Sequence, residues 1–512
     1  MSVQSDESTR SDPNVERQQA LMEEVARHTG ALPKAFANFV GGRWAPPGGD
    51  VLTAFSPALG GVIGTVPAAT REEVDAACLE ASRAAEAFGA LTPADRSKLC
   101  HRVADSLAKH EDELAYWLSL DQGKPLQREA LVEARVCLLF FRQAAEDILR
   151  LEGDTIPSTS ASKRIFTNYR SRGPYAVITP WNFPYNIASE HLSAHFAAGN
   201  PVVWVPSPEV SASAMVFARA LVEADIPPGV FNVLTGLGAL AGDAAVTNPS
   251  ISGISFTGSS ATGDLIMRRA GAKPALLELG GNGPVIVLAD ADLSAAVEGI
   301  VFSAYFNAGQ SCSATERVLV AREAHDELVE RLETATASVV LGQPFGASTT
   351  MGPLNNEAVA AKMDAHIADA VDNGAKVVAG GKRQGGFPTD LYFPPTLLDG
   401  VSAGSLVCRE ETFGPIIPLL QVDGPDEALR LANEGPTGLV ASVYTRDLRS
   451  AMTFSRRLHH GLVNINETPD YWELNVPYGG GGGTTSGIGR LGGRHALRSV
   501  MDLQATIVEV GS

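Results

Sequence analysis

The chain has 512 residues, of which 45% are hydrophobic and 19% are charged. That length suggests about three domains, and the composition is ordinary for a globular protein with a buried core. The formal net charge is −18, which disfavours nucleic acid and anionic membrane surfaces as partners. The five cysteines form no CxxC pair, so neither a zinc site nor a disulfide framework is predicted.

The N-terminal segment lacks the apolar core that a signal peptide needs, and no apolar run is long enough to cross a bilayer. We therefore expect a cytoplasmic protein. Residues 1–38 are predicted to be an N-terminal extension at the surface, with a short amphipathic helix near 15–28. Residues 71–150 are predicted to be mostly helical, as in 71–88, where alanine and leucine recur at helical spacing.

From residue 173 onward, short apolar runs alternate with loops and helices. The runs lie at 175–178, 202–205, 230–234 and 254–256, and each ends in Gly, Ser, Thr or Pro. This spacing predicts βαβ units and a mainly parallel sheet, in which ligands bind beyond the carboxyl ends of the strands. A second α/β series starts at 284–288 and includes strands at 377–379, 439–444 and 462–465, and a last strand is predicted over 503–510.

Cys312 follows a predicted helix and lies between two serines, in a polar segment that is poor core material. A thiol in such surroundings can be held as a thiolate and act as a nucleophile, although an inert buried thiol is the alternative. Glu278 is a single acid inside an apolar run that ends in two glycines, so desolvation would raise its pKa and suit it to general-base work. A paired structural acid is the alternative there.

Asn182 follows a predicted strand, where its amide could donate to an oxyanion or simply form a turn. Glu411 and Phe413 lie in a segment that would ordinarily be a solvated loop. A run of five glycines at 479–483 is either a floppy loop or a backbone that another group approaches closely.

Six segments together resemble the aldehyde dehydrogenase superfamily in their sequence, order and spacing. They are TPWNFP at 179–184, FTGSSATG at 256–263, LELGGNGP at 277–284, FNAGQSC at 306–312, EETFGP at 410–415 and SGIGR at 486–490. The resemblance covers roughly residues 39–510. It implies an α/β fold with two doubly wound domains and a small β oligomerisation arm. The cofactor domain would comprise 39–152 and 173–283, the catalytic domain 284–490, and the arm 153–172 and 491–512.

The resemblance also implies roles for individual residues. Cys312 matches the nucleophile, Asn182 the oxyanion donor, and Glu278 the base that activates the deacylating water. The residues that match cofactor-binding positions are Trp181, Ser207, Gly258, Ser259, Glu411 and Phe413. The implied reaction is oxidation of an aldehyde to the carboxylic acid with NAD or NADP through a thioester on Cys312, in a homodimer or homotetramer.

The chain departs from the family pattern where the adenosine ribose is expected to bind. Val205 and Pro208 occupy positions at which the family usually has Lys and Glu, and Glu209 is one residue out of register. A missing cation penalises a 2′-phosphate more than a missing acceptor penalises a hydroxyl, so we expect NAD rather than NADP. The segment after Pro477 is two residues longer than in the family, and Leu491 replaces the usual Glu.

Glu190 stands where family members that take succinate semialdehyde have an Arg. A carboxylate there would repel an anionic substrate, and residues 469–472 would add aromatic surface and another acid. We therefore expect a neutral apolar or aromatic aldehyde, with a semialdehyde or a cationic amino-aldehyde as alternatives. Glu190 could instead face solvent or pair with His191.

Three other functions compete with this prediction. An enzyme of the same fold could transfer the acyl group to coenzyme A, although the presence of Glu278 favours hydrolysis. A binding protein that had lost activity would be expected to lack Cys312, Glu278 or Asn182, and all three are present. A cysteine hydrolase without a cofactor would leave the FTGSS and EETFGP segments unexplained.

Overall fold

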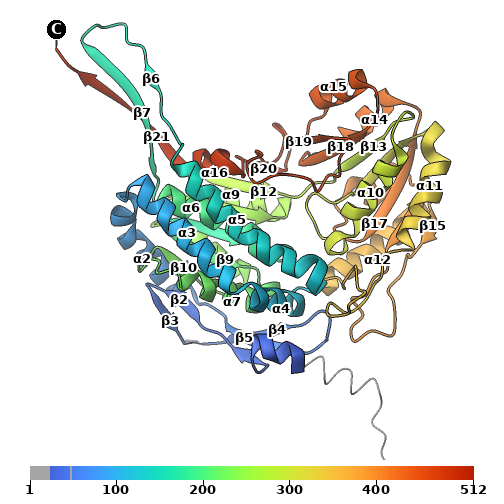
Figure 1. Ribbon diagram of the computed structural model, residues 1–512, viewed down its shortest axis with the longest axis horizontal. Helices are drawn as coiled ribbons and strands as arrows, with labels where there is room; N and C mark the ends of the chain where they lie inside the picture. The colour runs from blue at the N-terminus through green and yellow to red at the C-terminus, as the bar shows by residue number, and fades with distance from the viewer. Residues whose placement is uncertain (1–22, 47–48, 512) are drawn as a thin grey trace, which may run out of the picture.

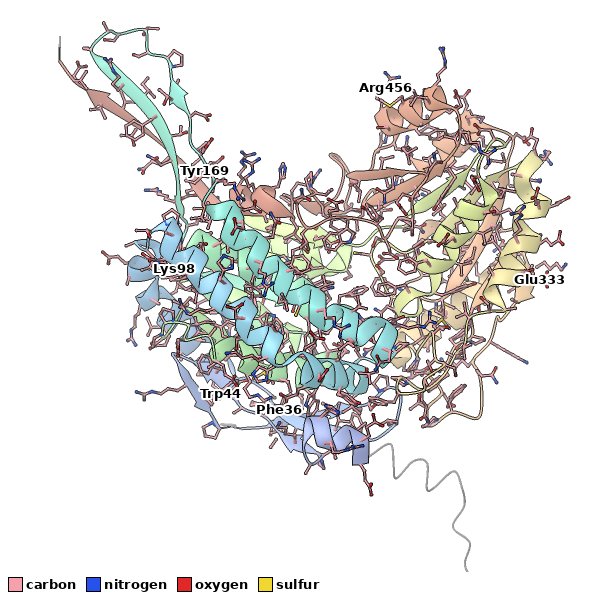
Figure 2. The ribbon with its side chains drawn as sticks, viewed as in Figure 1. Phe36, Trp44, Lys98, Tyr169, Glu333 and Arg456 are labelled. Atoms are coloured by element: carbon pink, nitrogen blue, oxygen red, sulfur yellow. The ribbon has the colours of Figure 1, made fainter. Side chains whose placement is uncertain are left out.

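The computed structural model describes residues 23–46 and 49–511 of the chain. Two sheets with their packed helices form the body, and a narrow β arm projects from it (Figure 1). Side chains fill the space between helices and sheets (Figure 2). No helix in the described part of the chain combines the length and apolar character of a membrane span.

The first sheet has eight strands in the order β20-β12-β11-β8-β9-β10-β2-β3. The strands from β12 to β10 in this order run parallel, and the outer strands pair antiparallel. The bounds are β2 (Asn38–Val40), β3 (Arg43–Ala45), β8 (Tyr175–Thr179), β9 (Val202–Pro206), β10 (Phe231–Val233), β11 (Gly253–Gly258), β12 (Ala275–Leu279) and β20 (Gly487–Ile488). The four strands predicted between residues 175 and 256 are confirmed.

Three of the eight helices that pack around this sheet, which start at residues 71, 93 and 260, begin at a residue whose side chain caps them. Thr70 caps the first of them in a capping box, because its side chain accepts from the backbone N–H of Glu73 while the Glu73 carboxylate accepts from Thr70 N. The helices are α2 (Arg71–Gly89), α3 (Pro93–Lys109), α4 (Glu111–Asp121), α5 (Leu131–Ile148), α6 (Pro184–Ala198), α7 (Ser211–Val222), α8 (Asp243–Thr247) and α9 (Ser260–Ala270).

The second sheet has seven strands in the order β15-β16-β17-β14-β13-β18-β19. All neighbours are parallel except β15 and β16. Its strands are β13 (Pro284–Val287), β14 (Arg317–Ala321), β15 (Lys376–Ala379), β16 (Thr396–Asp399), β17 (Ile416–Val422), β18 (Val440–Tyr444) and β19 (Leu462–Ile465). The central strands β13, β14 and β18 are buried along their whole length, as parallel strands covered on both faces must be.

The helices of the second half of the chain alternate with these strands. They are α10 (Leu293–Tyr305), α11 (Arg322–Thr336), α12 (Glu357–Asp372), α13 (Leu406–Arg409), α14 (Pro425–Ala432), α15 (Leu448–Arg457) and α16 (Gly493–Val500). A small separate sheet is formed by β1 (Lys34–Ala35), β5 (Val62–Pro67) and β4 (Val51–Phe55). The predicted α/β class is confirmed.

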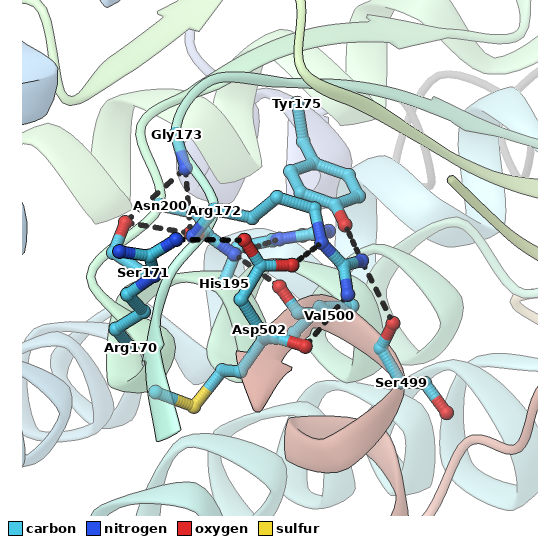
Figure 3. A network of polar contacts seen from close by, with 11 residues as sticks. Arg170, Ser171, Arg172, Gly173, Tyr175, His195, Asn200, Ser499, Val500 and Asp502 are labelled. Carbon is cyan, nitrogen blue, oxygen red and sulfur yellow. Dashed lines mark hydrogen bonds and ion pairs between the residues drawn. The ribbon is translucent and has the colours of Figure 1, made fainter. Parts of the chain in front are cut away.

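The projecting arm is a sheet of β6 (Thr155–Ile156), β7 (Lys163–Ser171) and β21 (Met501–Glu509). Arg172 fixes its root, where Nε donates to Asp502 over 2.8 Å and Nη2 donates to the Met501 carbonyl over 2.6 Å (Figure 3). The Asn200 amide ties the same point to the body, because Nδ2 donates to the Val500 carbonyl and Oδ1 accepts from Arg172 N. The arm is therefore anchored to the turn between α6 and β9.

The N-terminal extension differs from the prediction. Residues 23–29 are helical, Val25 is fully buried, and the His28 ring stacks on Tyr116 at 4.0 Å. Lys34 and Ala35 then pair with β5. Residues 23–38 thus pack against the body rather than forming a surface appendage. The part of the predicted helix before residue 23 lies outside the described residues.

Candidate active site

Cys312 sits on a turn whose backbone is held in a strained conformation. After α10, Asn307 and Ala308 adopt positive φ angles of 50° and 53°. The Asn307 side chain stabilises this turn, because its Nδ2 donates to the carbonyls of Asn182 and Gln310 at 2.9 and 3.0 Å. Such conformations persist only where the surroundings over-determine them, and they concentrate at functional sites.

Gly309 shows how closely the next loop approaches this turn. Its φ is 71°, and a Cβ at this position would lie 2.2 Å from the Gly414 carbonyl oxygen. Only glycine fits both the backbone angle and the space. The turn that carries Cys312 is thereby packed directly against the EETFGP segment at 410–415, which sequence spacing alone does not reveal.

Asn182 lies just beyond the carboxyl end of β8 and is 3% exposed. Its Nδ2 donates one hydrogen bond to the Gln310 carbonyl over 3.1 Å. An amide carries two N–H groups, so one remains for a ligand oxygen. Asn182 and Cys312 line the same cavity, which is the arrangement that an oxyanion donor requires.

Glu278 is on β12, directly opposite Thr257 of β11. It is 3% exposed, and its Oε1 has no hydrogen-bond partner among the described residues. Burial raises the pKa of Glu278 to about 8, a rise that hydrogen bonding to Cys312 and Thr257 opposes and the nearby Glu411 carboxyl reinforces. The carboxyl is therefore poised to exchange protons near neutral pH, as the sequence predicted.

The state of Cys312 corrects the sequence prediction. Burial raises the pKa of the Cys312 thiol well above its usual range, and Glu278 and other acids nearby raise it further. A hydrogen bond with Tyr478, at 3.3 Å between Sγ and Oη, opposes this only in part. The cysteine is thus a neutral thiol in these surroundings rather than a standing thiolate, because acids rather than cations surround it. It needs a base to become a nucleophile.

Two cavities meet at Cys312 and Glu278, since both residues line each of them. The first cavity, of about 210 Å³, contains five of the six predicted cofactor residues. They are Trp181, Gly258, Ser259, Glu411 and Phe413. Ser207 is not among the lining residues; its hydroxyl instead donates to the Glu209 carboxylate. The catalytic and cofactor roles themselves remain predictions.

Several features of the first cavity fit a dinucleotide. Ser259 caps α9, whose N-terminal N–H groups attract phosphate. Glu411 accepts from Gly281 N over 3.1 Å, and a Cβ on Gly280 would lie 2.6 Å from the Glu411 carboxyl, so only glycine allows this approach. The rings of Trp181 and Phe413 meet edge to face at 5.5 Å. An acid able to bind a ribose and an apolar wall thus lie beside the nucleophile.

Two residues that hold the segment beside this cavity carried no signal in the sequence. Lys362 on α12 lines the cavity and donates from Nζ to the Glu411 carbonyl over 3.1 Å. Glu316 precedes β14, and its buried carboxyl accepts from the backbone N–H groups of Thr412 and Phe413 at 2.7 and 2.9 Å. Both hold the EETFGP segment, and neither could be found without knowing which helix and strand pack against it.

The second cavity, of about 670 Å³, also reaches Cys312 and is called the tunnel below. Six aromatic side chains line it, and no Lys, Arg or His does so in the described part of the chain. The aromatic residues are Phe140, Phe183, Phe302, Phe306, Trp472 and Tyr478. Asp470 and Trp472 come from the wall predicted at 469–472, whereas Tyr478 was not predicted as a site residue.

Glu190 lines this tunnel, but its charge is not as predicted. It is 8% exposed, its Oε1 has no partner among the described residues, and His191 bonds to Thr257 instead. Burial raises the pKa of Glu190 to about 8, and Glu278 contributes to this rise. Glu190 is therefore mainly protonated at neutral pH, and the electrostatic repulsion expected of it is wrong. Desolvation of the carboxyl on the buried face of α6 is the reason.

The glycine run at 479–483 is held tightly at its first three residues. A Cβ on Gly461 would lie 1.7 Å from the Gly479 carbonyl oxygen, and one on Gly481 would lie 2.2 Å from the His459 carbonyl oxygen. The backbone is closely approached there, which was one of the two alternatives. Tyr478, immediately before the run, is the residue that reaches the tunnel.

Comparison with known proteins agrees with this geometry. The model of the aldehyde dehydrogenase family matches residues 44–506. The chain belongs to the aldehyde dehydrogenase family. The NADP-dependent succinate-semialdehyde dehydrogenase of Escherichia coli strain K12 is 36% identical over 96% of this chain and 98% of its own length. The glutarate-semialdehyde dehydrogenase of Pseudomonas aeruginosa is also 36% identical, over 91% of this aldehyde dehydrogenase and 96% of its own length.

Solved structures lead to the same conclusion. The crystal structure of an NAD-dependent aldehyde dehydrogenase from Sinorhizobium meliloti superimposes with a TM-score of 0.90 at 35% identity. The alignment covers 94% of this chain and 96% of that one. This protein is thus an NAD(P)-dependent aldehyde dehydrogenase. The named substrates of these two enzymes are semialdehydes, so the comparisons favour the alternative substrate prediction over the apolar or aromatic one.

Proposed function

We propose that this aldehyde dehydrogenase converts an aldehyde to its carboxylic acid through a thioester on Cys312. The observation that carries the proposal is that Cys312 and Glu278 stand where the cofactor cavity and the tunnel meet. Trp181, Phe413 and Glu411 line the first cavity and would hold NAD(P) there, which would supply the hydride acceptor.

The chain's own residues account for the proton transfers. The thiol proton of Cys312 passes to the ionised form of Glu278 as Sγ bonds to the aldehyde carbon, and the carbonyl electrons move to the oxygen, held by Asn182 Nδ2. After loss of hydride the carbonyl re-forms as a thioester. Glu278 releases the thiol proton to solvent and, ionised again, takes a proton from water, whose oxygen attacks the thioester carbon. The Cys312 sulfur leaves as a thiolate and regains a proton from Glu278.

The test is steady-state oxidation by a Cys312→Ala variant. The variant is expected to lose aldehyde oxidation while still binding cofactor. Near-normal activity in this variant would refute the assignment. Adding coenzyme A to the wild-type assay separates hydrolysis from acyl transfer, because only an acyl-transferring enzyme would form the coenzyme A thioester.

For the substrate, we infer a semialdehyde, in which a carboxylate lies at the far end from the aldehyde. The names of the relatives support this inference. So does the protonated state of Glu190, because a neutral carboxyl donates a hydrogen bond to an anion instead of repelling it. The amides of Gln143 and Asn186, which also line the tunnel, add neutral donors.

A specific observation favours a second candidate, an apolar or aromatic aldehyde. The tunnel has aromatic walls, and its described lining contains no cation for a carboxylate. The deciding measurement is kcat/KM for succinate and glutarate semialdehydes against hexanal and benzaldehyde. Higher values for the semialdehydes support the first candidate, and higher values for hexanal or benzaldehyde support the second.

For the cofactor, we infer a preference for NAD. Glu209 supports this, because Ser207 holds its carboxylate just past the end of β9, where the adenosine ribose of a cofactor is expected. A carboxylate can accept from a ribose 2′-hydroxyl and would repel a 2′-phosphate. Comparing kcat/KM with NAD and with NADP tests the inference, and a clear preference for NADP would overturn it.

We further propose a homodimer or homotetramer joined through the arm. Apolar side chains of β21 are exposed, with Leu503, Ile507 and Val508 at 53%, 64% and 38%. An unpaired edge strand with such residues invites pairing with another subunit. Sedimentation of the wild type and of a Leu503→Glu/Ile507→Glu variant tests the proposal, and a monomeric wild type would refute it. A cytoplasmic location remains a prediction.

A further inference from the structure

Both serines beside Cys312 donate hydrogen bonds to one carboxylate oxygen. Ser311 Oγ donates to Asp470 Oδ1 over 2.9 Å, and Ser313 Oγ donates to the same atom. The two serines are 3% and 4% exposed. Asp470 belongs to the loop between β19 and β20, so this contact joins the nucleophile turn to a distant part of the chain.

Asp470 lines the tunnel, but its other oxygen makes no hydrogen bond to the described part of the protein that would explain the residue otherwise. Oδ2 is shielded from solvent and has no hydrogen-bond partner among the described residues. Within the described part of the chain, Asp470 forms no ion pair, and its hydrogen-bond partners are the two serines. Buried polar groups ordinarily have hydrogen-bond partners. Among the described residues Asp470 has them only at Oδ1, so its structural contribution lies in the two bonds to the serines.

The charge of Asp470 works against the chemistry of its neighbour. Asp470 raises the pKa of the Cys312 thiol, as do Glu278 and Glu411, and Tyr478 is the hydrogen-bonding group that opposes them. A negative charge here hinders thiolate formation. The contribution of Asp470 must therefore come from the position of its acceptor oxygen rather than from its charge.

We propose that Asp470 is a positioning residue that fixes Ser311-Cys312-Ser313 through its bonds to the two serines. Bonds on both sides of Cys312 restrict rotation of the backbone that carries Sγ, and so orient the thiol toward the carbonyl carbon. Small misplacements of a reacting atom lower rates steeply, by about 10²-fold for 1 Å. The inference rests on the proposed role of Cys312 as the nucleophile.

The experiment compares four variants of the full-length enzyme. Asp470→Ala removes the acceptor, Asp470→Asn keeps an acceptor oxygen without the charge, and Ser311→Ala/Ser313→Ala removes both donors. The fourth variant combines Asp470→Ala with the two serine changes. Glu467→Gln is the matched control, because it neutralises an exposed carboxylate on the same loop.

The expected result is a loss of kcat of about tenfold or more in Asp470→Ala with little change in KM, since orientation rather than binding is impaired. Asp470→Asn should stay within about threefold of wild type, and its Cys312 should react with iodoacetamide at lower pH because the charge is gone. The serine double variant should match Asp470→Ala, and the combined variant should be no slower than either, as one coupled unit requires.

Three results would overturn the proposal. They are wild-type kcat in Asp470→Ala, equal damage in Asp470→Asn and Asp470→Ala, and additive losses in the combined variant. If Asp470→Ala does not fold, Asp470→Asn and the serine double variant still decide the matter. Activity in Cys312→Ala would refute the proposed function. Loss of activity in Cys312→Ala together with wild-type kcat in Asp470→Ala would refute only the positioning role.

Discussion

Glu278 offers the sharpest test of the proposed chemistry, because its protonation sets the rate of thioester hydrolysis. With a pKa raised to about 8, the carboxyl is protonated below that pH and becomes a base above it. About one-tenth of the molecules carry the ionised form at pH 7 and about nine-tenths at pH 9. The hydrolysis rate should therefore rise about tenfold between these pH values.

Replacing Glu278 by Gln removes the base without changing the size of the side chain. We expect thioester hydrolysis to slow by about 10²–10⁴-fold and to lose its dependence on pH between 7 and 9. Acylation should slow as well, because Glu278 also takes the thiol proton, and the acyl-enzyme should accumulate if hydrolysis slows more than acylation. The assay mixes enzyme, cofactor and aldehyde, quenches at intervals, and follows the acylated chain by intact mass.

Glu190→Gln is the matched control for this experiment. Glu190 is a second buried carboxyl of the same tunnel whose pKa is also raised to about 8, so it could mimic the pH dependence. Its variant should keep the tenfold rise. A wild-type hydrolysis rate that is flat from pH 7 to 9, or a rise that disappears in Glu190→Gln rather than in Glu278→Gln, would refute the reasoning.

Three further predictions concern other parts of the molecule. Asn182→Ala removes the amide that faces Cys312 and should lower kcat by about 10²–10³-fold, corresponding to about 2.7–4 kcal/mol, measured as steady-state turnover; a loss below tenfold would contradict it. Glu209→Gln should raise kcat/KM with NADP relative to NAD, since the repelling charge is removed, and an unchanged ratio would count against the cofactor inference. Lys124→Met leaves the buried Glu133 carboxylate without its ion-pair partner and should cost about 3–5 kcal/mol of unfolding free energy in urea, and Lys124→Met/Glu133→Gln should recover part of it.

Much of the fold follows from local sequence. The apolar runs of β8, β9, β11 and β13 predict buried parallel strands because such strands have no polar face, and the loops that follow them carry the residues of the site. The motifs around Cys312, Glu278 and Asn182 identify the family, and part of their backbone requirement is local, as in the positive φ of Gly309.

The protonation states of Glu190 and Cys312 did not follow from the sequence, whereas the raised pKa of Glu278 did. Glu190 was predicted to repel anions and Cys312 to be a thiolate, yet burial keeps both mainly neutral. Desolvation is a property of everything packed around a group, and the cavity that both residues line is formed by α5, α6, α10, β12 and the loop before Tyr478. A single segment cannot supply that information.

Contacts between residues that are distant in the sequence likewise depended on the tertiary structure. Lys362 and Glu316 hold the EETFGP segment, and Asp470 bonds to the serines beside Cys312, although about 160 residues separate Asp470 from them. Sequence determined which residues carry the chemistry, because nucleophile, base and amide are set by residue type. Only the tertiary packing of segments distant in the sequence decided which side chains orient them, since those contacts join segments with no common local pattern.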